Sequence, residues 1–226
     1  CLPQPGKAFW QARLPGRVVG RPVAAGDLLL CAWGERTGRG GVVALERATG
    51  QPRWEFEMPS GLEAGVTVHQ HEGKAYVFFC GRGGRVPGER GWLYCLRLED
   101  GRPAWTQPRP TSGACYAAPI LQEVRLYVGG DGSRVDCYDW RTGTAEQVGG
   151  WPAATGPGRQ WLYLCKSGLL AVTGIGEVHL LDPLTGRTCW AAPLRLGESV
   201  RAAPIQQDEM LYIVTEAGAR LALDVR

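Results

Sequence analysis

A glycine followed four residues later by a tryptophan recurs along this chain, and this repeat limits the folds that the chain can adopt. The internal copies, counted from their glycines, are spaced 51, 42 and 43 residues apart, the first interval being longer because residues 81–91 are inserted. A period of about 42 residues is typical of propeller blades. The copies are GKAFW (6–10), GQPRW (50–54), GRPAW (101–105) and GRTCW (186–190), with GTAEQ (143–147) as a degenerate one.

The apolar segments between the copies have the pattern of β-strands. They are short, rich in β-branched and aromatic residues, and bounded by glycine, proline and aspartate, which favours antiparallel strands over helices. Few windows could hold a helix of two turns. The expected strands include residues 28–33, 42–45, 75–80, 92–98, 125–130, 135–140, 178–182, 210–215 and 221–225.

Four strands fit into each period, so we expect an all-β fold. The pattern predicts a β-propeller of about five four-stranded antiparallel blades, forming one domain over residues 1–226. Residues 6–14 supply a fourth strand alone, and residues 199–226 supply the other three. We therefore expect the ring to close by pairing of residues 6–14 with residues 219–226, which would remove exposed sheet edges; a slice of a larger propeller is the alternative. The continuous blades are expected at about 20–60, 62–110, 114–151 and 157–196.

The repeat resembles the PQQ-like, or quinoprotein-type, β-propeller repeat, in its non-catalytic branch. The resemblance rests on the Thr-Gly turn, the tryptophan four residues later and a small-residue–proline step such as AAPI (117–120). It covers nearly the whole chain. It implies that the tryptophans dock between blades and that the turn glycine lets the third strand reverse into the fourth. The expected docking residues are Trp10, Trp54, Trp105 and Trp190; Gln147 breaks the pattern unless Trp151 substitutes.

The same resemblance raises the question of enzyme activity. It implies, for the catalytic relatives, eight blades, an adjacent cysteine pair and a calcium site, whereas no two cysteines are adjacent here. His69 and His71 lie two residues apart on one strand face, but we expect no third metal ligand near them. We therefore expect no catalytic, cofactor-binding or metal-binding residues and no cofactor. A small-ligand or quinone- or metal-binding enzyme domain is the alternative.

The eight cysteines stand singly and form no C-x-x-C motif. Free cysteine commonly serves as a small core residue, which favours reduced thiols and a cytoplasmic location. Two alternatives stay open. The chain could be secreted with disulfides, or it could be periplasmic or lipid-anchored through Cys1.

The charge pattern points to a protein partner. The net charge of +3 is too mild to indicate nucleic acid, and no apolar run is long enough to span a membrane. All but three of the 25 basic residues are arginine. On a propeller, an excess of arginines falls on one face, formed by the loops between second and third strands and by the connections between blades; we call it the loop face.

We expect the loop face of a non-catalytic scaffold or sensing module to bind a protein with an acidic surface. The binding would centre on the insertion at residues 81–91, because rigid scaffolds carry function on loops. The resemblance also implies possible fusion to, or association with, a signalling or defence protein. The expected contact residues are Arg36, Arg39, Arg82, Arg85 and Arg90.

Overall fold

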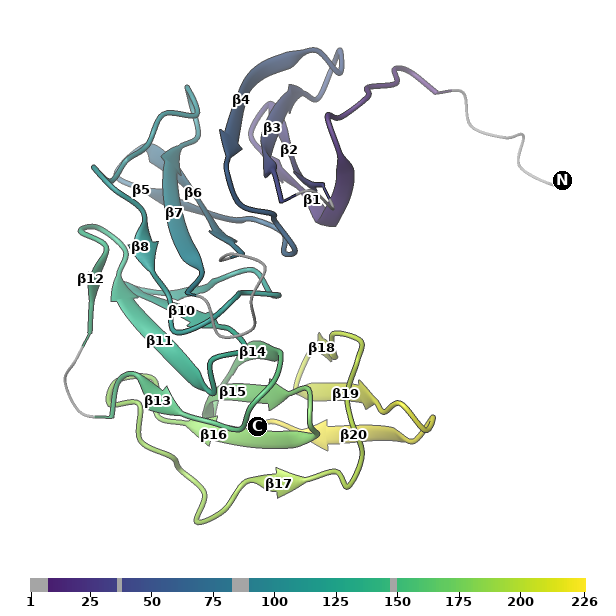
Figure 1. Cartoon of the computed structure of the whole chain (residues 1–226), viewed down its shortest axis with the longest axis vertical. Helices are drawn as coiled ribbons and strands as arrows, with labels where there is room; N and C mark the ends of the chain where they lie inside the picture. The colour runs from purple at the N-terminus through teal and green to yellow at the C-terminus, as the bar shows by residue number, and fades with distance from the viewer. Residues whose placement is uncertain (1–7, 36–37, 83–89, 147–149) are drawn as a thin grey trace, which may run out of the picture.

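The strands form five antiparallel sheets that follow one another round an arc (Figure 1). The computed structural model describes residues 8–35, 38–82, 90–146 and 150–226. Within these ranges no helix is long and apolar enough to cross a membrane. The sheets correspond to the expected blades and are numbered blade 1 to blade 5 in chain order.

The first two blades are each a meander of four strands, paired in chain order. Blade 1 comprises β1 (Arg17–Ala25), β2 (Leu28–Gly34), β3 (Gly40–Glu46) and β4 (Pro52–Met58). Blade 2 comprises β5 (Thr67–His71), β6 (Lys74–Gly81), β7 (Trp92–Arg97) and β8 (Arg109–Pro110).

The later blades keep this order with two variations. Blade 3 comprises β9 (Ile120–Gln122), β10 (Arg125–Gly129), β11 (Arg134–Asp139) and an outer strand in two parts, β12 (Thr144–Ala145) and β13 (Ala153–Ala154), both paired with β11. Blade 4 comprises β14 (Gln160–Cys165), β15 (Gly168–Thr173), β16 (Glu177–Leu181) and β17 (Leu194–Arg195). Blade 5 has three strands, β18 (Ile205–Gln207), β19 (Met210–Val214) and β20 (Arg220–Asp224).

The fourth strands are shorter than the sequence pattern predicts. Only β4 is full length, at seven residues, while β8, β12 and β17 have two residues each. In blade 2 the reason is visible in the chain, because Pro103, Pro108 and Pro110 fall within this segment and proline cannot donate to a strand ladder. Blade 2 therefore keeps its tryptophan, Trp105, although its fourth strand is only two residues long.

The core lies between the blades, in a separate cluster at each junction. Successive residues of β6 face opposite neighbours: Val77 and Phe79 pack towards blade 1, whereas Phe78 and Cys80 pack towards blade 3. All four are fully buried. Because both faces of an inner strand are covered, its sequence is a continuous apolar run instead of an alternating one.

The expected ring closure is not seen among the described residues. The described part of the N-terminal segment packs on blade 1, where Trp10, Ala12 and Leu14 cover a cluster that includes Trp33 and Val43. The two ends of the arc lie apart, and β20 has only β19 as a partner among the described strands (Figure 1). The N-terminal segment therefore occupies the face of blade 1 that a preceding blade would cover.

Candidate interaction site

The turns between third and fourth strands have one geometry in the first four blades. Each contains a glycine at φ between +69° and +73°, a region that side chains other than hydrogen disfavour. The amide of each glycine donates to the carbonyl four residues earlier, over 2.7 to 2.9 Å. We call these residues the turn glycines: Gly50, Gly101, Gly143 and Gly186.

Each turn glycine is covered by a tryptophan that precedes its blade. A Cβ atom on Gly101 would lie 2.6 Å from the ring of Trp54, and one on Gly50 would lie 2.5 Å from Trp10. Trp105 covers Gly143 in the same way, with Arg109 beside it. Glycine is therefore required at this position for two reasons. Other residues disfavour the positive φ, and a side chain would clash with the tryptophan ring.

The indole nitrogens complete these contacts at three of the junctions. Each donates to the carbonyl three residues before the turn glycine: Trp10 to Arg47 at 2.9 Å, Trp54 to Leu98 at 2.7 Å and Trp105 to Trp140 at 2.9 Å. Trp54 and Trp105 are buried. The blades are thus held by a repeated contact that combines apolar burial with a directed hydrogen bond.

At the junction between blades 3 and 4, a tryptophan outside the repeat position covers the turn glycine. Trp151 covers Gly186, whose Cβ would lie 2.7 Å from its ring. Its indole nitrogen has no hydrogen-bond partner within the described residues. The carbonyl at the equivalent place, that of Pro183, instead accepts a bond from the Tyr127 hydroxyl.

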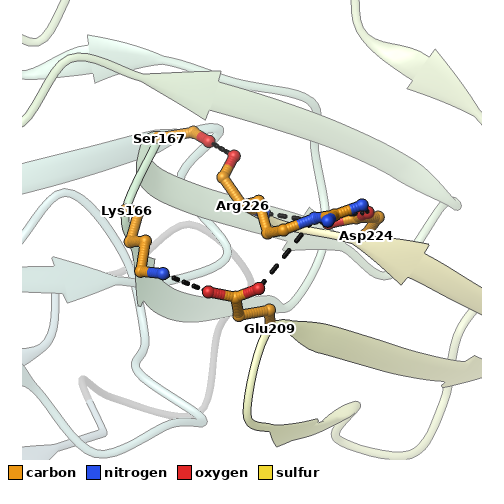
Figure 2. A network of polar contacts seen from close by, with 5 residues as sticks. All are labelled: Lys166, Ser167, Glu209, Asp224 and Arg226. Atoms are coloured by element: carbon orange, nitrogen blue, oxygen red, sulfur yellow. Dashed lines mark hydrogen bonds and ion pairs between the residues drawn. The ribbon is translucent and has the colours of Figure 1, made fainter.

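Trp190 departs from the expected docking role. Its side chain is 38% exposed, and the described chain of blade 5 offers no turn glycine for it. Blades 4 and 5 are joined by their apolar cluster and by the Tyr163 hydroxyl, which donates to the Pro204 carbonyl at 2.7 Å. A polar network adds to this junction, and Figure 2 shows its members converging from the two blades. It comprises Lys166, Ser167, Glu209, Asp224 and Arg226.

On the loop face, Arg39 lies within ion pairs while its side chain projects outwards. The guanidinium of Arg39 lies 3.4 Å from Glu35 and 3.0 Å from Glu57, with the side chain 56% exposed. Their carboxylates raise the pKa of Arg39 further above its usual range, first through the hydrogen bonds that Arg39 donates to Glu35. Arg36 and Arg85 lie outside the described residues.

Arg82 belongs to a second cluster that draws residues from several blades. Glu63 lies 3.6 Å from Arg82 and 3.5 Å from Arg17, so that one carboxylate joins blades 1 and 2. Arg159 stacks over the ring of Tyr116 at 4.4 Å. Burial, and secondarily Asp131, raise the pKa of Tyr116, while Arg82 and Arg159 oppose this shift. These residues therefore interact across the junctions of four blades.

Arg90 lines a cavity of about 490 Å³ on the same face. Arg134 and Asp136 also line it, and Asp136 is 9% exposed. Burial raises the pKa of Asp136, although bonds from the amide and hydroxyl of Ser112 act against this. Arg39, Arg82 and Arg90 thus lie in loops between second and third strands, in three separate charged environments.

The residues considered as metal ligands form no such site in the part of the chain described here, which contains no group of three or more metal-binding side chains. His69 and His71 instead flank Trp140, with ring centroids 4.8 and 5.1 Å from it. Burial, and secondarily the charge of His71, lower the pKa of His69. The described cysteines are free thiols, most of them buried.

Repeating blades, the turn glycines and the interblade tryptophans together define a β-propeller of the PQQ-like class. Residues 38–164 and 149–226 match the family described as outer membrane protein assembly factor BamB, and the chain belongs to this family. The match covers more than half of the chain and confirms the resemblance inferred from the repeats.

Individual relatives agree with this assignment. The outer membrane protein assembly factor BamB of Burkholderia pseudomallei (strain K96243) is 28% identical over 184 residues, which are 79% of this chain and 45% of that protein. The crystal structure of BamB from Moraxella catarrhalis superposes with a TM-score of 0.65 and 19% identity, covering 95% of this chain and 59% of that one. The chain therefore spans about half the length of the curated relative.

A europium-containing methanol dehydrogenase has the same fold. It superposes with a TM-score of 0.67 at 13% identity, covering 97% of this chain and 51% of that one. Since fold does not determine chemistry, this likeness shows the architecture alone.

The comparisons overturn the expected cytoplasmic location. The family and the curated relative are named for assembly of outer membrane proteins, which points away from the cytoplasm and towards the periplasmic or lipid-anchored alternative. Cys1, on which the anchored alternative depends, lies outside the described residues. The cytoplasmic expectation failed because buried single cysteines pack as small apolar groups in any compartment.

Proposed function

We propose that this chain is a non-catalytic scaffold that binds protein partners during the assembly of outer membrane proteins, in the bacterial cell envelope. Its family membership supports this role. The observation that carries the proposal is the convergence of Arg17, Glu63, Arg82, Tyr116 and Arg159 on the loop face. Arginine and tyrosine are the residue types that most often dominate protein interfaces.

The partner surface is acidic. A guanidinium has five donors, and one carboxylate satisfies two of them. Arg17 and Arg82 share the single carboxylate of Glu63 and keep exposed side chains, so this group retains a positive charge and can bind a further carboxylate. The full contact set comprises Arg36, Arg39, Arg82, Arg85 and Arg90, extended by Tyr116 and Arg159.

The experiment is affinity capture from detergent-solubilised envelopes, with the bound proteins identified by mass spectrometry at low and moderate salt. We expect outer-membrane assembly proteins on the unmodified chain, fewer at moderate salt because exposed charge pairs are screened, and a loss of at least about tenfold on the combined Arg39→Ser, Arg82→Ser and Arg159→Ser variant. The matched control is Arg102→Ser with Arg187→Ser, two exposed arginines at turns of the opposite face.

The two parts of the proposal fail separately. If the unmodified chain captures no outer-membrane assembly protein, the scaffold role is wrong. If it captures them and the loop-face variant does so equally well, with its fold intact by circular dichroism, the role stands and the surface is wrong.

A further inference from the structure

The cavity that Arg90 lines lies where the outer strand of blade 3 is interrupted. β12 ends at Ala145 and β13 begins at Ala153, and the cavity extends from this interruption to Asp136 in the middle of β11. Its volume of about 490 Å³ falls within the range of roughly 300–1,000 Å³ that is typical of small-molecule sites. It is therefore large enough to hold a small ligand.

Blades 2 and 4 have hollows at the equivalent place, between the third strand and the segment that follows the turn glycine. They are smaller, about 80 and 70 Å³, and their walls include Trp105 in blade 2 and Trp190 in blade 4. Blade 3 has Gln147 at this position of the repeat. The large cavity thus coincides with the repeat that lacks the tryptophan, and is not a general result of short fourth strands.

Four charged side chains line the cavity, two of each sign. Arg90 and Arg134 are exposed and so lie at its opening, whereas Asp136 is buried and Glu146 is half-buried. In the part of the chain that the structure describes, none of the four forms an ion pair. Arg134 lowers the pKa of Asp136 only as a lesser cause, after burial, which raises it, and the bonds from Ser112. Both kinds of charge therefore remain available to a ligand.

The buried carboxylate is held in a fixed orientation. The amide of Ser112 donates to one oxygen of Asp136 over 2.6 Å, and the Ser112 hydroxyl donates to the other oxygen. A carboxylate has about four lone-pair sites, so Asp136 can accept further bonds from a ligand. A cation beside it would also favour its ionised form, against the effect of burial. The cavity thus has an ordered acceptor in its interior and two guanidinium groups at its opening.

We propose that this cavity binds a short peptide through its two free termini. The terminal carboxylate accepts hydrogen bonds from Arg90 and Arg134, because guanidinium groups bind carboxylates with matched geometry. The terminal ammonium group donates to Asp136 and Glu146. A ligand with only one charge would displace water from the opposite pair of side chains without replacing its interactions, which costs free energy. The cavity therefore favours a zwitterion over an anion or a cation.

This peptide site does not depend on the proposed scaffold role. Arg90 belongs both to the cavity and to the surface proposed for the acidic partner. Arg134 and Glu146 belong to the cavity alone, so they are the residues to change. Loss of peptide binding in their variants leaves the capture experiment with Arg39, Arg82 and Arg159 unaffected, and the two proposals can fail separately.

The test is titration of the chain with dialanine and trialanine, followed by calorimetry and by ligand-observed nuclear magnetic resonance. Two derivatives of each peptide are titrated beside it: the N-acetyl form, which keeps only the carboxylate, and the C-terminal amide, which keeps only the ammonium group. We expect a dissociation constant below about 1 mM for at least one unmodified peptide. Its two derivatives should bind at least about tenfold more weakly, because each leaves one pair of charges unpaired.

Two variants then assign the charges. Arg134→Gln should bind the peptide at least about tenfold more weakly and reduce its advantage over the C-terminal amide, whereas Glu146→Gln should reduce its advantage over the N-acetyl form. Arg187→Gln, at an exposed arginine of the turn in blade 4, is the control and should bind like the unmodified chain.

Three results would overturn the proposal. The first is that neither peptide binds in either measurement. The second is that the unmodified peptide and its two derivatives bind equally well. The third is that Arg134→Gln and Glu146→Gln, with their fold intact by circular dichroism, bind as the control does. The first two comparisons use the unmodified chain, so the proposal can be judged even if a variant does not fold.

Discussion

The hydroxyl of Tyr127 in blade 3 donates a hydrogen bond of 2.9 Å to the carbonyl of Pro183 in blade 4. Pro183 stands three residues before a turn glycine, the place where the indoles of Trp10, Trp54 and Trp105 donate at other junctions. Here Trp151 covers the glycine and Tyr127 makes the bond. Two residues from different segments of blade 3 therefore make the two contacts that one tryptophan makes elsewhere.

Because Trp151 covers the glycine and Tyr127 makes the hydrogen bond, the effect of removing the Tyr127 hydroxyl alone can be predicted. Tyr127→Phe keeps the ring and leaves the partly buried Pro183 carbonyl without its partner, so it should lower the free energy of unfolding by about 1–2 kcal/mol. Tyr212→Phe is the matched control, because Tyr212 follows the same pattern in β19 and is 45% exposed. Urea denaturation of both variants measures the difference; equal effects would mean that the Tyr127 bond contributes nothing.

Removal of the tryptophans should separate the docked residues from the exposed one. Trp54→Ala and Trp105→Ala should each lower the free energy of unfolding by about 3–5 kcal/mol, since each leaves a large cavity between blades. Trp190→Ala should cost less, about 1 kcal/mol, because its side chain is 38% exposed and leaves no enclosed cavity between blades. Thermal and urea unfolding test this order. A loss at Trp190 as large as that at Trp54 would show that the ring is buried in solution.

The sequence predicts the blades well because their signals are local. Short apolar strands and turn glycines recur in the first four repeats, and the tryptophan spacing recurs in most of them, so several copies support each assignment. The sequence did not place Trp151, since it lies outside the G-x-x-x-W spacing and was only a possible substitute for Gln147. The sequence also could not predict ring closure, because a fourth-strand motif is equally compatible with a closed ring of five blades and with a larger propeller.

The candidate site was harder to predict than the fold. Loop assignment placed Arg39, Arg82 and Arg90 on one face, but ion pairs depend on side chains that are distant in sequence. Glu63, which lies between Arg17 and Arg82, gives no signal in the chain itself.

The turn glycines can be tested against a glycine of the same conformation. Gly101 and Gly73 have φ of +70° and +74°, but only Gly101 faces a ring, that of Trp54, whereas nothing lies within 4 Å of a Cβ on Gly73. Gly73→Ala should therefore cost about 1–2 kcal/mol, from backbone strain. Gly101→Ala should cost about 2–4 kcal/mol, because the ring must also move. Equal losses of the free energy of unfolding in urea denaturation would show that Gly101 is not needed to make room for the Trp54 ring.

The turn before Gly186 predicts a dependence of stability on pH. One carboxylate oxygen of Asp182 accepts bonds from the amides of Leu184 and Thr185 and from the Thr185 hydroxyl, over 2.7 to 3.0 Å. These bonds, chiefly those from Thr185, lower the pKa of Asp182 below its ordinary value of 3.8. The carboxylate thus contributes stability above that value, and the contribution is lost as the pH falls through the lower pKa of the folded state.

Asp182→Ala should therefore be less stable than the unmodified chain at pH 7, and the difference should shrink as the pH is lowered towards 3. Other carboxylates also lose their bonds in acid, so the difference between the two chains, and not the absolute stability, is the quantity to follow by urea denaturation at each pH. Thr185→Val removes one of the three donors and should give a smaller dependence in the same direction. A difference that stays constant from pH 7 to pH 3 would show that the ionised form of Asp182 does not stabilise this turn.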